Sequence, residues 1–415
     1  VNAAPGFRMH LAPSEGIGRN VAEPVVDMLF PAGSKGRIPI VAVTGTNGKT
    51  TTTRLNAHIA KTMGYKVGFT TSDGIYIQNR MMEKGDCTGP VSAKFVLMDP
   101  TIDYAVLECA RGGLLKAGLA FDKCDISIVT NVTADHIGLK DIDSVEEMAK
   151  VKSVVPETTR KEGYAILNAD DDLVFDMRKN LECNLVLFSM DENNPRIKAH
   201  CERGGVAAVL EDGWVSIIKG TWKIRVEKVV NIPLTLGGKA AFMIQNILPC
   251  VAAAFVQNFK IEDLKLALNT FIPSPTMTPG RMNVFKFKHF EMLVDFAHNP
   301  DGFQAISNYL AKVEMHPKVG VIAAAGDRRD EDIRELGRIA GRTFDEIIIR
   351  QDKNLRGRTD EEIMNLLKEG IFEINPNMPV ICINPEADSI KYCIENAKKG
   401  SHITVCSDVI AEALD

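Results

Sequence analysis

The sequence predicts an α/β protein with a large domain, built on a parallel sheet and carrying a phosphate loop, and a smaller Rossmann-like C-terminal domain. Three observations predict this class. Short apolar runs alternate with helical segments through most of the chain. A Gly/Thr-rich loop at 44–51 joins a buried strand to a helix. The segment 273–280 contains three prolines and a glycine, and the alternation resumes after it.

Composition excludes several classes of protein. Of the 415 residues, 45% are apolar and 25% are charged, which is typical of a packed globular protein and unlike collagen or a disordered chain. The formal net charge of −5 provides no basic field, so we expect neither nucleic acid nor a membrane surface as a partner. Nine cysteines without a C-x-x-C pair favour free thiols in a reducing cytoplasm. No apolar run reaches the roughly 18 residues of a membrane helix.

The first part of the chain shows two kinds of sequence. Residues 1–37 are rich in glycine and proline and lack a sustained period apart from an apolar stretch at 25–30, which indicates a linker. A strand at 38–43 and a helix beginning near Lys49 open the α/β pattern. The elements expected next are strands at 104–107, 125–130 and 164–167, and a helix at 144–155.

A β-rich patch and two helices complete the large domain. Asp212-Gly213 predicts a hairpin between 206–210 and 214–218, at one edge of the same sheet. The helices are expected at 240–259 and 261–270. After the proline-rich segment, strands are expected at 292–296, 319–325, 346–350, 380–383 and 403–406, and Thr359 with Glu362 predicts a capping box for a helix reaching about residue 369. The expected domains are therefore 1–37, 38–278 and 279–415.

The loop after the first strand has the composition of a nucleotide phosphate site. Glycines let the backbone approach phosphate oxygens, a lysine supplies charge to the β- and γ-phosphates, and a hydroxyl suits Mg²⁺. The residues concerned are Gly45, Thr46, Asn47, Gly48, Lys49, Thr50 and Thr51. The usual first glycine of such a loop would fall at Val43, so the loop is a variant. The alternative is a glycine-rich turn that binds nothing.

Two further side chains follow strands that should end beside this loop. Glu108 ends one strand and His136 follows another. Because parallel strands end at the same edge of a sheet, both groups should face the crevice there and could hold a second Mg²⁺. The alternatives are a helix-capping glutamate and a structural histidine.

The ordered motifs resemble those of ATP-dependent Mur-type amide ligases. These motifs are Thr44 to Thr51, Glu108, Asp135-His136, Pro279-Gly280-Arg281-Met282 and Asp295 to Pro300, and they extend from about residue 38 to the end of the chain. The resemblance implies a Mur ligase-like fold, with ATP and Mg²⁺ as cofactors. It also implies phosphorylation of a carboxylate to an acyl phosphate, which an amine then attacks, and a homo-oligomeric state.

Three intervening segments are more particular. Ser72 to Ile75, Gly85 to Pro90 and Glu108 to Gly113 resemble the family branch that joins arginine to the β-carboxylates of an aspartate polymer. Arginine and an aspartate-containing polymer are therefore the partners that this resemblance implies. The opening residues, Val1 to Gly6, resemble the last metal-binding turn of an ATP-grasp domain. On that basis residues 1–37 would be a remnant of such a domain with a linker.

The resemblance also assigns roles to single residues. Lys49 would stabilise the transferred phosphoryl group, Thr50 and Glu108 would bind Mg²⁺, and His136 the second ion. Lys152 would be a carbamylated lysine supporting that ion, with Lys150 as a rival and a solvated lysine as the alternative. Asn246 would approach adenine, although Met243 departs from the family pattern there. Further residues expected at the site are Arg281, Asp295 and His298 for nucleotide and domain closure, and Ser72, Asp73, Asp86, Thr88, Arg111, Asp327 and Asp352 for substrates.

Two other readings remain open from the sequence. The chain could be another Mur-type ligase, acting on a peptidoglycan precursor or on folate. It could also be a catalytically silent module that assembles or holds polymer.

Overall fold

The computed structural model describes residues 6–33, 36–134, 142–350, 355, 357–407 and 413–414. The chain forms two compact units, residues 1–39 and 40–415. The described part of the first unit contains α1 (Arg8–Leu11) and α2 (Ala22–Leu29), and buries none of its residues. The short helix α2 includes most of the apolar stretch noted at 25–30, and the interpretation of residues 1–37 as a linker and domain remnant stays a prediction. Asn20 accepts a hydrogen bond from the Glu23 N–H and Pro24 lies in the first turn, where proline is tolerated.

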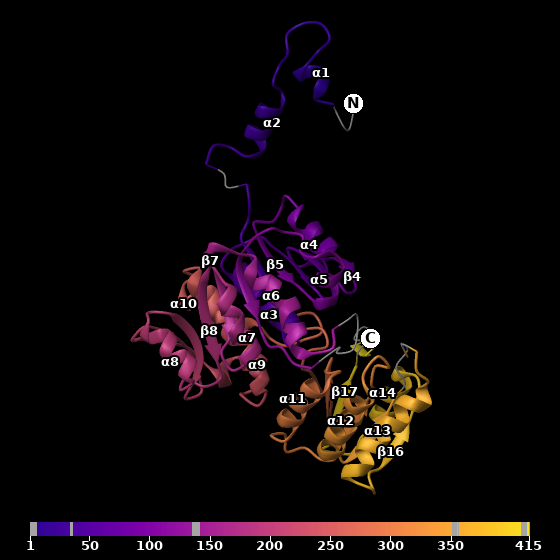
Figure 1. The fold of residues 1–415 in the computed structure, drawn as a ribbon. Helices are drawn as coiled ribbons and strands as arrows, with labels where there is room; N and C mark the ends of the chain where they lie inside the picture. The colour runs from indigo at the N-terminus through magenta and orange to yellow at the C-terminus, as the bar shows by residue number, and fades with distance from the viewer. Residues whose placement is uncertain are drawn as a thin grey trace. The chain divides into compact units, whose positions relative to one another are not determined.

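The second unit contains a large sheet whose order is β11-β10-β9-β8-β7-β6-β1-β5-β2-β3-β4 (Figure 1). Its central strands are parallel, whereas β3, β4, β10 and β11 are antiparallel additions at the two edges. The strands are β1 (Ile40–Thr44), β2 (Val67–Thr71), β3 (Gly74–Ile77), β4 (Arg80–Lys84), β5 (Tyr104–Glu108), β6 (Cys124–Val129), β7 (Thr159–Asn168), β8 (Asn184–Ser189), β9 (Val206–Glu211), β10 (Trp214–Lys219) and β11 (Trp222–Lys228).

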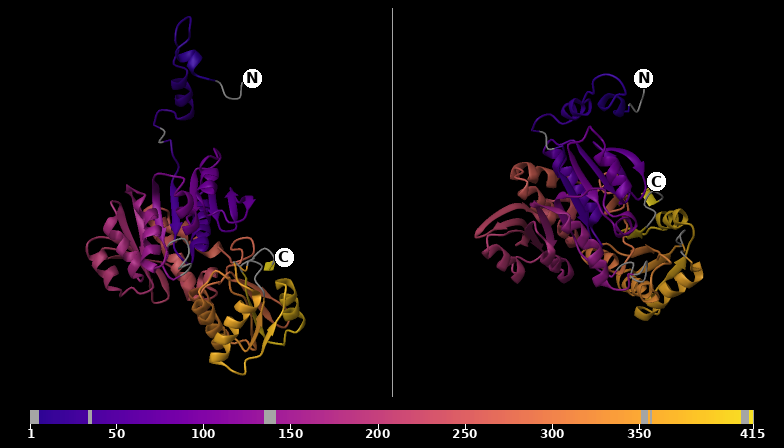
Figure 2. Two further views of the ribbon diagram at one scale, coloured as in Figure 1. Left: turned by 45° about the vertical axis from the view of Figure 1, so that its right-hand side comes forward. Right: turned by 45° about the horizontal axis from the view of Figure 1, so that its top comes forward.

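Helices cover both faces of this sheet. On one face lie α3 (Lys49–Thr62), α9 (Ala241–Val256) and α10 (Ile261–Thr270), which share one apolar core with the strands. On the other lie α4 (Pro90–Leu97), α5 (Arg111–Ala117), α6 (Val145–Glu157), α7 (Asp172–Asp176) and α8 (Pro195–Glu202). Figure 2 shows these helices from two further directions. Because both faces are buried, the central strands are almost continuously apolar, as their short sequence runs indicated.

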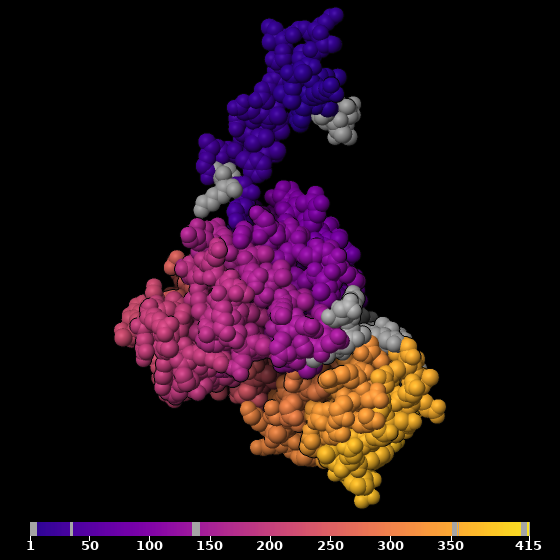
Figure 3. Space-filling model, viewed as in Figure 1, coloured from indigo at the N-terminus to yellow at the C-terminus, as the bar shows by residue number. Residues whose placement is uncertain are grey.

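A second sheet follows the proline-rich segment. Its order is β12-β13-β17-β14-β15-β16, with all neighbours parallel except β12 and β13. The strands are β12 (Asn283–Lys286), β13 (Glu291–Asp295), β14 (Lys318–Ile322), β15 (Glu346–Ile349), β16 (Val380–Cys382) and β17 (His402–Cys406). One face carries α11 (Pro300–Leu310), α12 (Asp330–Thr343) and α13 (Asp360–Ile374), and the other carries α14 (Glu386–Glu395). Figure 3 shows this C-terminal part, orange to yellow, in space-filling form.

The α/β fold with a phosphate-loop domain and a smaller second domain is confirmed, and so are several of its elements. The hairpin turn lies at Asp212 and Gly213, whose φ angles of 47° and 76° are both left-handed, and it extends one edge of the large sheet. The capping box of Thr359 and Glu362 starts α13. The strand expected at 319–325 is shorter, because β14 ends at Ile322. The domain boundary at 278/279 stays a prediction; it falls in the segment between α10 and β12.

Among the residues that the structure describes, no helix is long and apolar enough to span a bilayer.

Candidate active site

The phosphate loop takes its shape from two glycines between β1 and α3. Gly45 has a φ of 143°, and a Cβ there would lie 1.9 Å from the Thr130 hydroxyl. Gly48 has a φ of 86°, and its Cβ would lie 2.1 Å from the Asn246 side-chain oxygen. Neither position accepts a side chain. Val43 lies inside the buried strand β1, so the loop begins only after it, which is why no glycine is needed at Val43.

A second segment, after β6, holds the loop from one side. The Asn131 side chain accepts a hydrogen bond from the Asn47 N–H at 2.8 Å and donates to the Asn47 carbonyl at 3.2 Å. The Thr130 hydroxyl donates to the same carbonyl at 2.7 Å, and Thr46 accepts from the Thr133 N–H at 3.0 Å. These hydrogen bonds fix the loop where it leads into the N-terminus of α3. The backbone N–H groups at a helix N-terminus are suited to binding an anion.

Lys49 and Thr50 begin α3 and point to different partners. The Lys49 ammonium donates to the Thr46 carbonyl at 2.8 Å, folding back over the loop. The Thr50 hydroxyl donates to Glu108 at 3.0 Å and shares a hydrogen bond of 3.1 Å with the Ser72 hydroxyl. The Ser72 N–H also donates to Glu108, at 3.3 Å. Thr50 and Glu108, which were predicted together as Mg²⁺ ligands, therefore meet Ser72, which was predicted as a substrate residue. Thr51, the last residue of the predicted loop, is buried in the same turn.

Glu108 is a nearly fully buried carboxylate at the end of β5. Burial raises its pKa, and the opposing effects of Lys49 and of the Thr50 hydrogen bond are smaller. A buried carboxylate beside two hydroxyl groups is a donor set that hard cations such as Mg²⁺ prefer. The residues present therefore fit a divalent cation, which would supply the positive charge that burial makes Glu108 require.

The turn after β2 is held by an arginine that the sequence analysis missed. Arg54, buried on α3 one turn after Thr50, pairs with Asp73 and donates to the Tyr76 hydroxyl at 2.7 Å. Tyr76 donates to Asp73 at 2.5 Å, and burial raises its pKa to about 12. Arg54 also donates to the Met277 carbonyl at 3.3 Å, in the segment before the second sheet. Asp73 is therefore engaged within the protein, which favours a positioning role over direct contact with substrate.

The other residues predicted on this side form a separate group. Asp86 accepts hydrogen bonds from the N–H and hydroxyl of Thr88, at 3.2 and 2.7 Å. A Cβ on Gly113 would lie 2.8 Å from the Cα of Gly89, so the first turn of α5, which begins at Arg111, packs closely on this loop. The structure thus brings Asp86, Thr88 and Arg111 into one neighbourhood.

Of the two candidate lysines on α6, only Lys152 reaches the phosphate loop. It is buried and donates to the Gly45 carbonyl at 2.7 Å, whereas Lys150 is exposed. Asn246 lies on α9 with its side chain against Gly48 and its amide donating to the Met243 sulfur at 3.6 Å. This places Asn246 at the loop, and its contact with adenine stays a prediction.

A hydrogen bond joins the segment after β13, in the second sheet's part of the chain, to the phosphate loop. Asn299 is buried, caps α11 by accepting from the Gly302 N–H at 2.8 Å, and donates to the Asn47 side chain at 3.1 Å. Its predicted neighbour His298 makes a 3.0 Å hydrogen bond with the Phe296 carbonyl. The Asp-x-x-His-Asn-Pro order contained a helix-capping signal at Asn299 that the sequence analysis did not use.

Asp295 and Arg281 are two further predicted residues near the contact between Asn299 and the phosphate loop. Asp295 is buried and accepts from the Met282 and Ala297 N–H groups, at 2.8 and 2.9 Å, and burial raises its pKa. The Arg281 guanidinium lies 4.2 Å from the Phe296 ring centre and is attracted by Asp295 and Glu108. Burial lowers the pKa of Arg281, yet an arginine remains protonated at neutral pH.

Three predicted residues remain, of which one pairs with a neighbour in the C-terminal part and two lie outside the described residues. Asp327, after β14, lies 3.5 Å from Arg328 in the second sheet, and both are largely buried. His136 and Asp352 lie outside the described residues, so the second metal ligand and one substrate contact stay predictions.

Comparison with protein families shows to which family the chain belongs. Residues 43–254 match the Mur ligase middle domain, and residues 280–409 match the Mur ligase glutamate ligase domain. The chain belongs to the Mur ligase family. Its two matched regions coincide with the two sheets described above.

Among curated Mur ligase relatives, the similarity is graded. The chain is 50% identical to a cyanophycin synthetase of Geminocystis herdmanii and 49% identical to one of Synechocystis, in both cases over 415 residues. It spans about half the length of these relatives, 47% in each case. The UDP-N-acetylmuramoyl-L-alanyl-D-glutamate--2,6-diaminopimelate ligase of Caldanaerobacter subterraneus is 26% identical over 373 residues, which are 88% of this chain and 71% of that ligase.

Solved structures show the same Mur ligase fold at low identity. Escherichia coli FolC in complex with ADP has a TM-score of 0.67 at 17% identity, covering 94% of this chain and 90% of that one. A bifunctional folylpolyglutamate synthase/dihydrofolate synthase with Mn, AMPPNP and L-glutamate bound has a TM-score of 0.65 at 18% identity, covering 94% and 90%.

Proposed function

We propose that this chain is the part of a cyanophycin synthetase-like enzyme that forms amide bonds at the expense of ATP. In this proposal it joins the α-amine of arginine to β-carboxylates of a poly-aspartate backbone through an acyl phosphate. The observation that carries the proposal is the identity of about 50% to cyanophycin synthetases along all 415 residues, together with a complete phosphate loop. The identity to a peptidoglycan-precursor ligase is about half as high, so that alternative is less supported.

The ATP-binding role rests on the loop geometry. Two relatives of the same fold were solved with ADP or with AMPPNP, which supports the same use of the crevice in this chain. Lys49 would leave the Thr46 carbonyl and stabilise the γ-phosphoryl group during transfer. Arg281 and Asp295 would act at the boundary between the sheets, and His298 and Asn299 would close over the nucleotide and exclude water from the acyl phosphate.

A divalent cation fits the donors beside the loop. Thr50 and Glu108 would hold it, with His136 as the expected ligand of a second ion and Lys152 as its support. When bound, Mg²⁺ neutralises charge on the phosphate oxygens and orients them. The protein groups position the acceptor carboxylate, and Lys49 and Arg281 compensate the remaining negative charge.

The substrate assignments are the least direct part of the proposal. Ser72 and the group of Asp86, Thr88 and Arg111 would meet the polymer. Asp327, in the segment after β14, and Asp352, which lies outside the described residues, would meet the arginine guanidinium. The free thiols at all nine cysteines support a reducing compartment, and we propose a cytoplasmic homo-oligomer.

A coupled assay tests the proposal. The chain is incubated with ATP, Mg²⁺, arginine and an aspartate-based acceptor, and ADP, phosphate and the mass of the acceptor are measured. We expect a gain of one arginyl group per ADP. Lys49→Ala should lose turnover, whereas Lys61→Ala, an exposed lysine on the same helix, should keep it. Arginine transfer by Lys49→Ala at the normal rate would contradict the nucleotide site. A wild-type chain without any ATP-dependent ligation would favour the silent-module reading.

A further inference from the structure

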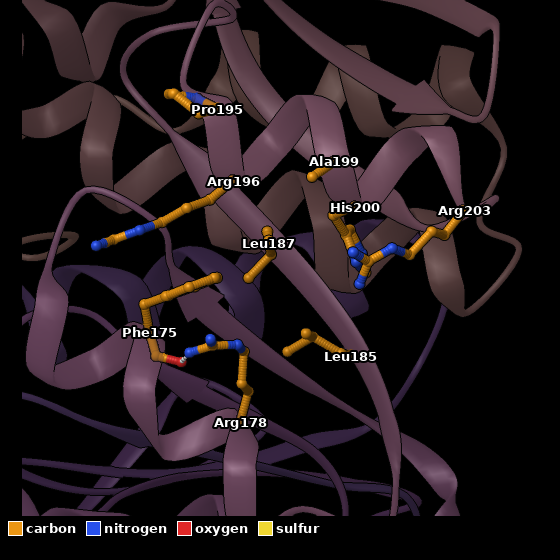
Figure 4. A pocket seen from close by; sticks show the side chains of 9 residues that line it. All are labelled: Phe175, Arg178, Leu185, Leu187, Pro195, Arg196, Ala199, His200 and Arg203. Atoms are coloured by element: carbon orange, nitrogen blue, oxygen red, sulfur yellow. Dashed lines mark hydrogen bonds between the residues drawn. The ribbon is translucent and has the colours of Figure 1, made fainter.

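A hollow with an arginine-rich wall lies away from the phosphate loop. It has a volume of about 340 Å³ and lies between α7, α8 and β8 (Figure 4). The phosphate loop follows β1, three strand spacings from β8, or roughly 14 Å across the sheet. Leu185 and Leu187 of β8 form part of its floor, and its lining residues do not include any of the phosphate loop or of the groups described around that loop.

One face of α8 supplies most of its polar wall. Arg196, Ala199, His200 and Arg203 line the hollow at a spacing of three and four residues, which places them on one side of the helix. Figure 4 shows the Arg203 guanidinium beside the His200 ring. The His200 ring is fixed, because Nε2 makes a 3.2 Å hydrogen bond with the Val206 carbonyl and a Cβ on Gly205 would lie 2.4 Å from that nitrogen.

Two of the three arginines are held in place but keep unused donors. The Arg178 guanidinium lies 3.6 Å from the centre of the Phe175 ring, and its Nη1 donates to the Phe175 carbonyl and to Asp176. Arg196 lies 4.4 Å from the same ring, donates to the Ala169 carbonyl and pairs with Asp172. Each guanidinium has five N–H donors, so several remain available to a ligand.

Arg203 differs from these two. Within the described part of the chain, no carboxylate or carbonyl accepts a hydrogen bond from its side chain, and it is exposed. The hollow therefore combines two ion-paired arginines with one uncompensated arginine above an apolar floor of leucine, proline and alanine. Such a surface suits an oxyanion carried on an aliphatic stem. A nucleotide base is less suited, because two guanidinium groups already lie over the Phe175 ring.

We propose that this hollow is a second binding site for the polymer, in which the arginines hold the free α-carboxylates of its arginyl groups. This inference rests on the proposed function. An arginine joined through its α-amine keeps its carboxylate and its aliphatic stem, which match the arginine wall and the apolar floor. An extended chain spans about 3.3–3.6 Å per residue, so a long polymer reaches both sites and a two-unit one does not. Simultaneous attachment would raise the effective concentration of polymer ends at the ligase site.

Binding measured without ATP tests this site. Fluorescence anisotropy would compare a labelled arginyl-aspartate oligomer of two units with one of about twenty units, which is long enough to reach both sites. We expect the wild-type chain to bind the long oligomer more tightly, and Arg203→Gln to reduce that affinity about fivefold while leaving the short one unchanged. Lys198→Gln removes the same charge from an exposed position on α8 outside the hollow and should leave both affinities unchanged. Replacing the α-carboxylates of the long oligomer by carboxamides should remove its advantage.

The outcomes separate this inference from the proposed function. Equal affinity of wild type and Arg203→Gln for the long oligomer would overturn the second site. An equal loss in Lys198→Gln would also overturn it, since general charge attraction would then explain the effect. Arginine transfer to the two-unit acceptor is scored separately with ATP and Mg²⁺. If wild type fails that assay, the proposed function fails, whatever the binding data show.

Discussion

Burial of the Glu108 carboxylate in the candidate site carries an electrostatic cost to folding. It is buried at the end of β5, and its neighbours Lys49 and Thr50 compensate its charge only in part, so its pKa is raised. A carboxyl group with a raised pKa disfavours folding once it ionises. Stability should therefore fall as the pH rises from the ordinary value of 4.5 through the raised one.

Glu108→Gln tests this cost and the metal site together. Without Mg²⁺ we expect the variant to be more stable at neutral pH, by about 1 kcal/mol, because a buried charge is removed. Adding Mg²⁺ and a non-hydrolysable ATP analogue should raise the melting temperature of wild type much more than that of the variant. An equal rise in both proteins would contradict a role for Glu108 in cation binding.

His402 predicts a pH effect in the second sheet. It is fully buried on β17, and burial, followed by the charge of Lys318, lowers its pKa to about 4. Below pH 6.5 this histidine binds a proton in the unfolded chain but not in the folded protein. The free energy of unfolding therefore decreases as the pH falls from 6.5 towards 4. Denaturant unfolding should show this loss, of about 1–3 kcal/mol, in wild type. His402→Gln should flatten the profile in that window, and an unchanged slope would contradict the assignment.

Among the elements, two helix caps in the C-terminal part form a natural pair. Asn299 caps α11 and also donates to Asn47 of the phosphate loop, whereas Thr359 caps α13 through its capping box and touches no part of the loop. Substituting each cap in turn therefore distinguishes a loss of stability in the second sheet from a loss of contact between that sheet and the nucleotide site.

Asn299→Ala and Thr359→Ala should each cost about 1 kcal/mol of unfolding free energy, since each loses a cap. Only Asn299→Ala should also weaken nucleotide binding, because only that change releases Asn47. Calorimetric titration with a non-hydrolysable ATP analogue compares the two variants. Equal nucleotide affinity in both would indicate that the Asn299 to Asn47 hydrogen bond does not support the loop.

Local sequence signals predicted the elements that depend on local chemistry. Asp212-Gly213 marked a hairpin because both positions need left-handed backbone, and the Gly48-Lys49-Thr50 run marked the start of α3. The strands β2 to β4, β8 and β12 were missed. β4 is exposed along its length and lies at the sheet edge, so its sequence lacks the apolar run that identifies a buried strand.

Several residues of the candidate site could be named from the sequence, but the hydrogen bonds and ion pairs between them could not. Lys49, Thr50, Glu108 and Ser72 could be named from the sequence, yet the role of Arg54 depends on contacts with Asp73, Tyr76 and Met277, far apart in sequence. The available signal was that Arg54 follows Thr50 by four residues on α3. This spacing indicates a role for Arg54 only once the fold is known, because the fold places the turn after β2 beside α3. Non-local hydrogen bonds of this kind cannot be read from a single sequence.

The whole molecule combines two sheets so that one provides the phosphate loop and the other approaches it through Asn299. That arrangement suits a reaction in which a reactive acyl phosphate must be shielded from water while an amine enters. In the proposed reaction the acceptor carboxylate, and not water, attacks the γ-phosphate of ATP.

Oxygen-18 transfer tests this step most directly. An acceptor labelled with ¹⁸O in its β-carboxylates is incubated with ATP, Mg²⁺ and arginine, and the phosphate released is analysed by mass spectrometry. Formation of an acyl phosphate predicts one ¹⁸O atom in each phosphate released with a new amide bond. Amide formation accompanied by unlabelled phosphate would contradict the proposed mechanism.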